Sequence, residues 1–199
     1  MESDPRLTLP PFGSPGTGPG NRRRRPRASL GSAVARMLVT LGAICLGAGA
    51  TAGDGAPAPF PVSLIDPRTG DAVELRPGAP LLHLVFFATW CPPCRDELPR
   101  LTELDTRWGN AGYRLVVVAV AARQSTERLR EFVDSANIGG EVLFDSTGDV
   151  QKKLGATQLP THVVVDERGT VLVRAPSLSA EVESVIESVM AERMRRSGR

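Results

Sequence analysis

The chain has 199 residues, enough for one domain of ordinary size and an additional segment, since single domains usually contain roughly 100–150 residues. Its formal net charge of +2 hides an uneven distribution, because seven arginines and only two acids precede residue 53. The rest of the chain holds 17 basic and 20 acidic residues, a net charge of −3, so we expect no nucleic-acid partner.

The first 36 residues are rich in arginine, proline and glycine. They offer too little apolar surface to offset chain entropy, so we expect residues 1–36 to be a disordered basic region. Residues 37–52 are uncharged, apolar and end in the small-residue pattern ATA. This succession is typical of an export signal cleaved after Ala52, and an uncleaved membrane anchor is the alternative. We interpret Cys45 as a passive apolar residue of this segment.

Residues 53–60 are predicted to form a linker without fixed structure, and residues 61–195 are predicted to form the folded domain. The segments SLID and AVEL flank the turn-like sequence PRTGD, which predicts a short N-terminal hairpin. The run LLHLVFFA at 81–88 is almost entirely apolar, as expected for a strand that is covered on both faces of a parallel sheet.

Apolar residues recur at helical spacing from Cys91 to Gly109, and Pro99 is expected to kink this helix. The later segments alternate between apolar runs and amphipathic stretches. Further strands are expected at 114–121, 141–144, 161–166 and 170–174, and further helices after Ser125, over 149–155 and through 182–190. This order predicts the α/β class with a mixed central sheet flanked by helices.

Two of the three cysteines, Cys91 and Cys94, stand two residues apart where the apolar strand gives way to the helix. Structural zinc needs four ligands, and the only histidines, His83 and His162, fall within predicted strands without the spacing of a ligand pair. We therefore expect no metal. A buried, inert pair is the plainer alternative, but a helix N-terminus stabilises a thiolate and favours a redox-active dithiol.

If Cys91 caps the helix, Pro92 and Pro93 occupy its first two positions, where proline is tolerated. These prolines remove two N–H donors and leave that of Cys94. We therefore predict that the pKa of Cys91 is lowered but not extreme, which favours a reducing or balanced dithiol over a strong oxidant. Cys91 is expected to be exposed and to attack, and Cys94 to be shielded and to resolve the mixed disulfide.

The segments FFATWCPPCRDELPRL and GATQLPTHVVVDERGTV resemble the active-site and proline segments of the exported TlpA/ResA-like thiol-disulfide oxidoreductases. The resemblance covers about residues 57–190 and implies a thioredoxin-like fold, which the N-terminal hairpin extends. It also implies a cis peptide bond and a catalytic place for Pro160, with the backbone of Leu159 able to pair with a substrate. Glu97, about one helical turn beyond Cys94, is implied to help proton transfer.

The resemblance further implies a substrate-binding surface around the dithiol. We assign it to Trp90, Pro92, Pro93, Leu159 and Thr161. Val85 departs from the family, whose members often carry a polar residue there. The histidines are interpreted as satisfied core residues, with a proton-relay role as the alternative.

The implied function is a thiol-disulfide oxidoreductase, expected to be a reductase, in the periplasm or on the extracytoplasmic face of the cell membrane. Its implied partners are cysteine-containing envelope proteins, with apocytochrome c as one candidate, and a membrane thiol reductant as electron donor. We expect a monomer without metal or organic cofactor.

Two other classes stay open. A thiol peroxidase of the peroxiredoxin type would need a threonine three residues before its cysteine, where this chain has Ala88, with Thr89 one residue later. The other class is a non-catalytic envelope chaperone or metallochaperone that uses the fold as a binding surface.

Overall fold

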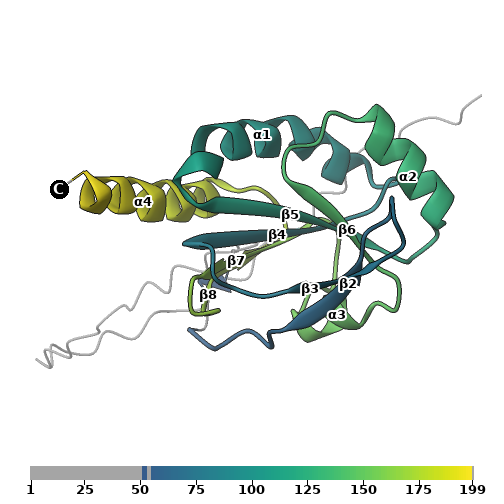
Figure 1. Ribbon diagram of the computed structural model, residues 1–199, viewed down its shortest axis with the longest axis horizontal. Helices are drawn as coiled ribbons and strands as arrows, with labels where there is room; N and C mark the ends of the chain where they lie inside the picture. The colour runs from purple at the N-terminus through teal and green to yellow at the C-terminus, as the bar shows by residue number, and fades with distance from the viewer. Residues whose placement is uncertain (1–50, 53–54, 199) are drawn as a thin grey trace, which may run out of the picture. The chain divides into compact units, whose positions relative to one another are not determined.

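The computed structural model describes residues 51–52 and 55–198 (Figure 1). The predicted disordered region and all of the predicted export signal before Thr51 lie outside the described residues. The chain divides into two units, Met1–Cys45 and Leu46–Arg199, and the architecture below is that of the second. Within the described residues, no helix combines the length and apolar character that a membrane span requires.

The described residues form one mixed sheet of eight strands, in the order β1-β8-β7-β4-β5-β6-β2-β3. The strands are β1 (Thr51–Ala52), β2 (Val62–Ile65), β3 (Ala72–Leu75), β4 (Leu81–Phe87), β5 (Tyr113–Val120), β6 (Glu141–Asp145), β7 (Thr161–Asp166) and β8 (Val171–Ala175). At the centre, β4 runs parallel to β5 and antiparallel to β7. This arrangement confirms the predicted α/β class with a mixed central sheet.

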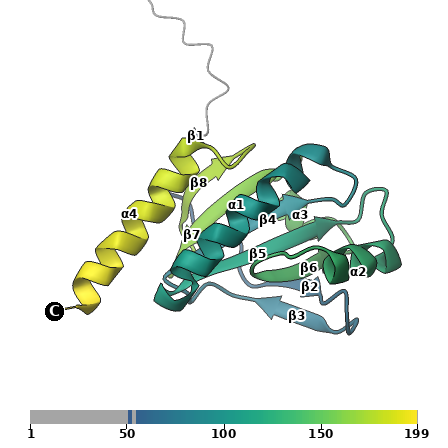
Figure 2. The same cartoon turned by 90° about the horizontal axis from the view of Figure 1, so that it is seen from above.

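The helices cover both faces of this sheet. They are α1 (Pro92–Trp108), η1 (Gly109–Ala111), α2 (Thr126–Ser135), α3 (Asp149–Lys153) and α4 (Ala180–Ser197). Figures 1 and 2 show α1, α2 and α4 over one face and α3 on the other. Pro99 lies inside α1, and the kink expected there stays a prediction.

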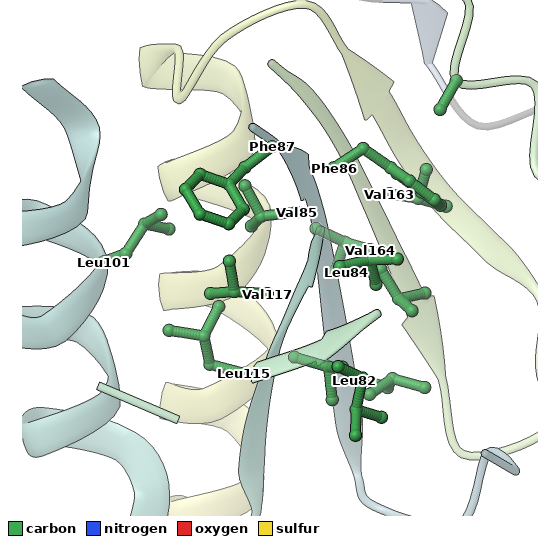
Figure 3. Close-up of a cluster of buried hydrophobic side chains, with 14 of the residues drawn as sticks. Leu82, Leu84, Val85, Phe86, Phe87, Leu101, Leu115, Val117, Val163 and Val164 are labelled. Carbon is green, nitrogen blue, oxygen red and sulfur yellow. The ribbon is translucent and has the colours of Figure 1, made fainter. Parts of the chain in front are cut away.

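All seven residues of β4 are buried, which confirms the prediction of a strand covered on both faces. Side chains alternate between the two faces of a strand. Figure 3 shows Val85 and Phe87 on the side of α1, near Leu101, whereas Leu84 and Phe86 lie on the opposite side. Because both faces of β4 are covered, its sequence is a nearly continuous run of apolar residues rather than an alternation of apolar and polar ones.

The N-terminal hairpin is present, since β2 pairs antiparallel with β3. The expectation of a structureless linker at 53–60 is wrong for its second half. The Ala58 N–H donates to the carbonyl of Gly169 at 2.8 Å, and Pro57 pairs with Thr170 as a β-bridge. Composition could not reveal this fixed path, because the backbone partners come from the distant turn between β7 and β8.

Candidate active site

The cysteine pair lies where β4 passes into α1, as the sequence predicts. Cys91 has extended backbone angles and is the N-cap residue of α1, with prolines at the first two helical positions. Its own N–H donates to the Ala88 carbonyl at 3.0 Å, closing a tight turn. The two prolines start the helix without loss, because the first N–H groups of a helix have no intrahelical partner.

Cys91 and Cys94 form a disulfide, with an S–S distance of 2.06 Å and a Cα–Cα distance of 5.4 Å. The Cys94 N–H donates to the Cys91 sulfur at 3.3 Å. This is the donor that the two prolines leave in place. Among the described residues, no group of three or more His, Cys, Asp or Glu side chains is arranged to hold a metal ion.

The expectation that Cys91 is exposed is wrong for this oxidised form. Cys91 is 4% exposed and Cys94 is 2% exposed, so both are buried. Both side chains belong to the buried apolar cluster of the core, and the Cys91 sulfur is bonded to that of the shielded Cys94. The residues that flank Cys91 in sequence, Trp90, Pro92 and Pro93, are all exposed.

Trp90 is 39% exposed and is braced by the loop between β5 and α2. Its indole N–H donates to the Ala122 carbonyl at 2.7 Å, and the Arg123 guanidinium lies 4.1 Å from the ring centroid. Arg123 adopts a φ of +54°, in the left-handed region that few non-glycine residues occupy. The indole is therefore held by a hydrogen bond and by Arg123 against its ring, while Trp90 stays exposed.

Gln124 stabilises the same turn through hydrogen bonds to Thr89 and Val120. Its Oε1 accepts hydrogen bonds from both the N–H and the hydroxyl of Thr89, each at 3.0 Å, and its amide donates to the Val120 carbonyl. Arg123 and Gln124 were not predicted from the sequence. No local signal marks them, because their contacts arise only when β4 and β5 lie side by side.

The proline segment lies at the start of β7. The Leu159–Pro160 peptide bond is cis, as the resemblance implies. Thr161 pairs with Phe86 in the sheet, so the proline segment reaches the end of β4 from which the cysteine turn departs. Leu159 is partly buried, and Pro160 and Thr161 are buried. The Thr161 hydroxyl donates to the Gln158 carbonyl at 2.8 Å.

Glu97 is held by two groups from outside its helix. Its Oε1 accepts the Leu178 N–H at 2.9 Å, and its Oε2 lies 2.9 Å from His162 Nε2. His162 Nδ1 lies 3.0 Å from His83 Nε2, and His83 Nδ1 lies 2.7 Å from the Tyr113 hydroxyl. The two histidines are satisfied core residues, as interpreted, but they also connect Glu97 to Tyr113.

Burial shapes the acid–base behaviour of this group. Both histidines are 0% exposed. Desolvation, followed by the neighbouring His162, lowers the pKa of His83 well below its usual range, because burial disfavours the charged form. Desolvation, followed by the charge of Asp105, raises the pKa of Tyr113. His83 and Tyr113 are therefore neutral at physiological pH.

Comparison with known families and proteins gives consistent matches. The model of the AhpC/TSA family matches residues 72–174. The thioredoxin-like protein YneN of Bacillus subtilis (strain 168) is 33% identical over 91 residues, which cover 44% of this chain and 51% of that protein. The thiol-disulfide oxidoreductase ResA of Bacillus thuringiensis subsp. konkukian (strain 97-27) is 26% identical over 110 residues, 54% of this chain and 62% of that protein. The chain thus spans less than two thirds of the length of either relative.

Solved structures give a similar result. The structure of MTB dsbF in its mixed oxidized and reduced forms has a TM-score of 0.58 and 25% identity, covering 68% of this chain and 98% of that one. StoA from Bacillus subtilis has a TM-score of 0.54 and 22% identity, covering 65% and 98%. These likenesses confirm the thioredoxin-like fold that the resemblance implies.

Proposed function

This chain belongs to the AhpC/TSA family, and from that premise we propose that it is a thiol-disulfide oxidoreductase acting through Cys91 and Cys94. The observation that carries the proposal is the disulfide at the N-terminus of α1, with the Cys94 N–H donating to the Cys91 sulfur. The same donor and the helix dipole would stabilise a Cys91 thiolate after reduction. The name of the similar ResA protein supports the same activity.

The proposed reaction has two exchange steps. In the reduced protein, the Cys91 thiolate attacks one sulfur of a substrate disulfide, forms a mixed disulfide and expels the other substrate sulfur as a thiolate. The Cys94 sulfur then attacks Cys91, which forms the Cys91–Cys94 bond and releases the second substrate thiolate. Two electrons have passed to the substrate, whose sulfurs each take up a proton. Glu97 is proposed to accept the Cys94 proton, as a base one helical turn away.

The surface that meets the substrate is proposed to surround the dithiol. The exposed Trp90, Pro92 and Pro93 would form one side. The backbone of Leu159, ahead of Pro160, would pair with an extended substrate segment, and Thr161 would continue this side. The position of the proline segment, at the end of β4 beside the cysteine turn, supports this arrangement.

We further propose a reductase in the cell envelope. The support is the basic and apolar N-terminal sequence, which is typical of an export signal or an N-terminal anchor. The substrates would be envelope proteins with cysteines, apocytochrome c among them. A membrane thiol reductant would return the disulfide to the dithiol, and the protein would work as a monomer.

A peroxidase role has less support from the site. The threonine nearest to Cys91 in sequence, Thr89, donates its hydroxyl hydrogen to Gln124, and the position three residues before Cys91 is Ala88. A peroxiredoxin-type site would need a threonine at that position. Measuring peroxide consumption beside disulfide reduction separates the two activities.

Reduction of insulin by the full chain, with dithiothreitol as electron source, tests the proposal. The wild-type protein should accelerate reduction, and Cys91→Ser should abolish the acceleration. Cys94→Ser should stop at a mixed disulfide that mass spectrometry detects. Cys45→Ser, which changes the remaining cysteine, is the matched control and should leave the rate unchanged. An undiminished rate in Cys91→Ser would refute the proposal.

A further inference from the structure

Four polar side chains from four elements form a continuous hydrogen-bonded row. Tyr113 comes from β5, His83 from β4, His162 from β7 and Glu97 from α1. The successive distances are 2.7, 3.0 and 2.9 Å. The row thus crosses the three central strands of the sheet and ends at the active-site helix.

Burying this row costs free energy that an apolar core would not. Polar groups removed from water are destabilising unless each finds a hydrogen-bond partner, and apolar side chains of similar volume could fill the same space without that demand. Both histidines are fully buried, and the rest of β4 is apolar. We therefore look for the role of the row at its exposed end, which is Glu97.

The hydrogen at His162 Nε2 can be assigned by elimination. To accept the Cys94 proton, Glu97 must start as a carboxylate, which only accepts hydrogen bonds; in that state His162 Nε2 carries a hydrogen and donates it to Glu97 Oε2. If His162 is neutral, its Nδ1 accepts from His83 Nε2, and His83 Nδ1 accepts from the Tyr113 hydroxyl. If His162 is charged, its Nδ1 donates to His83 Nε2, and His83 Nδ1 donates to the Tyr113 oxygen. His83 changes tautomer between the two patterns, but the donation to Glu97 is the same in both.

We propose that His162, with His83 and Tyr113 behind it, is a positioning residue that keeps the Glu97 carboxylate aimed as the proton acceptor of Cys94. This inference rests on the proposed dithiol function. Cys94 and Glu97 are three residues apart on α1, so their side chains lie on the same face. The two donors to Glu97, His162 Nε2 and the Leu178 N–H, fix both carboxylate oxygens and leave lone pairs for the Cys94 proton.

The hydrogen bonds to Glu97 come from His162 and from the Leu178 N–H, and the charged side chains Asp105 and Arg100 of α1 have other partners. On α1, Asp105 acts on Tyr113, and Arg100 is bonded to Glu103 of α1 and Glu183 of α4. The buried residues that α4 supplies are all apolar: Val182, Ile186 and Met190. The row is thus the polar contact that sets the orientation of the carboxylate from the side of the sheet.

The step that this geometry serves is the resolution of the mixed disulfide. The Cys94 thiol gives its proton to Glu97, and its sulfur electron pair attacks the Cys91 sulfur. The bond between Cys91 and the substrate breaks, and the substrate sulfur leaves as a thiolate that is protonated by water. The Glu97 side chain is 19% exposed, so it can release its proton to solvent before the next cycle.

Single-turnover kinetics of the reduced full chain test the inference, with formation and resolution of the mixed disulfide followed separately across pH 5–9. His162→Leu should slow resolution at pH 7 by roughly tenfold, within the range typical of residues coupled in one network, and should shift the pH midpoint of that step. His162→Gln, which keeps an N–H donor, should restore most of the rate. Formation of the mixed disulfide by Cys91 should stay unchanged in both variants.

A double-mutant cycle with Glu97→Gln supplies the decisive comparison. Adding His162→Leu to Glu97→Gln should cause no further loss, because the histidine acts only through the carboxylate. Additive losses, or wild-type resolution in His162→Leu, would overturn the inference. If the wild-type protein forms no mixed disulfide at all, the proposed function fails instead, so the two failures are distinguishable.

Nitrogen-15 NMR of the wild-type chain provides a test that holds even if a variant fails to fold. His162 should carry a hydrogen on Nε2 at pH 7, and His83 should be neutral from pH 5 to pH 8. A His162 Nε2 without hydrogen would overturn the inference, since the histidine would then accept from Glu97 rather than hold it.

Discussion

The groups around the Cys91 sulfur come from single residues, some close to it in the sequence and others distant. Its identity as a helix N-cap followed by two prolines follows directly from the letters CPPC at the end of an apolar run, and the structure confirms it. The place of Glu97 one turn later could be predicted for the same reason, since both belong to one helix. Tyr113, Arg123 and Gln124 could not, because each reaches the site from a strand or loop that is distant in sequence.

Arg123 is a residue whose backbone limits its replacement. Its φ of +54° is disfavoured for any residue with a Cβ atom, by roughly 1–2 kcal/mol. Arg123→Gly and Arg123→Ala both remove the guanidinium from the Trp90 ring, but only glycine relieves the backbone. We predict that Arg123→Gly is more stable than Arg123→Ala by about 1 kcal/mol.

Urea denaturation of the two variants, followed by circular dichroism, measures this difference directly. The pair controls for the lost side chain, since neither variant retains the stacking on Trp90. Equal midpoints for the two proteins would show that the left-handed conformation is not maintained in solution.

Secondary-structure elements were the most predictable level. The apolar run of β4, the hairpin turn before β3 and the spacing of Leu98, Leu101 and Leu104 in α1 each reflect a local pattern. The fixed path of residues 56–58 was missed, because those residues pair with the turn between β7 and β8 and with the start of β8. Local sequence patterns predict a strand or helix, whereas the segments that it pairs with depend on the path of the whole chain.

Within these elements, the central strand β4 carries an ionisable residue whose burial makes stability depend on pH. Burial lowers the pKa of His83 in the folded protein, while in the unfolded chain it should titrate near about 6.5. Below that pH the unfolded chain binds one more proton than the folded one. The free energy of unfolding therefore falls as the pH drops from about 7 toward 5, by up to about 1.4 kcal/mol per pH unit.

His83→Leu removes this dependence, so its stability should change less than that of the wild-type protein over the same pH range. Urea unfolding at pH 5, 6 and 7 provides the comparison. Most carboxylates titrate below this window and affect both proteins alike, so parallel curves for the two would contradict neutral burial of His83.

For the whole molecule, the strand order brings three distant segments together at one end of the sheet. The turn after β4 provides the cysteines, the loop after β5 braces Trp90, and the segment before β7 provides Pro160. The mixed sheet was predictable from the alternation of strands and helices, but its register was not. That register sets Phe86 opposite Thr161 and Val85 opposite His162, and so creates both the site and the row behind it.

The reduction potential of the Cys91–Cys94 pair is the most direct measure of what the whole molecule does. It can be obtained by equilibrating the full chain with dithiothreitol or glutathione buffers and quantifying the oxidised fraction by thiol alkylation. A reductase should have a potential near that of thioredoxin, about −270 mV. A value near −120 mV, typical of a strong disulfide donor, would contradict a reductase whose Cys91 thiolate is only moderately stabilised.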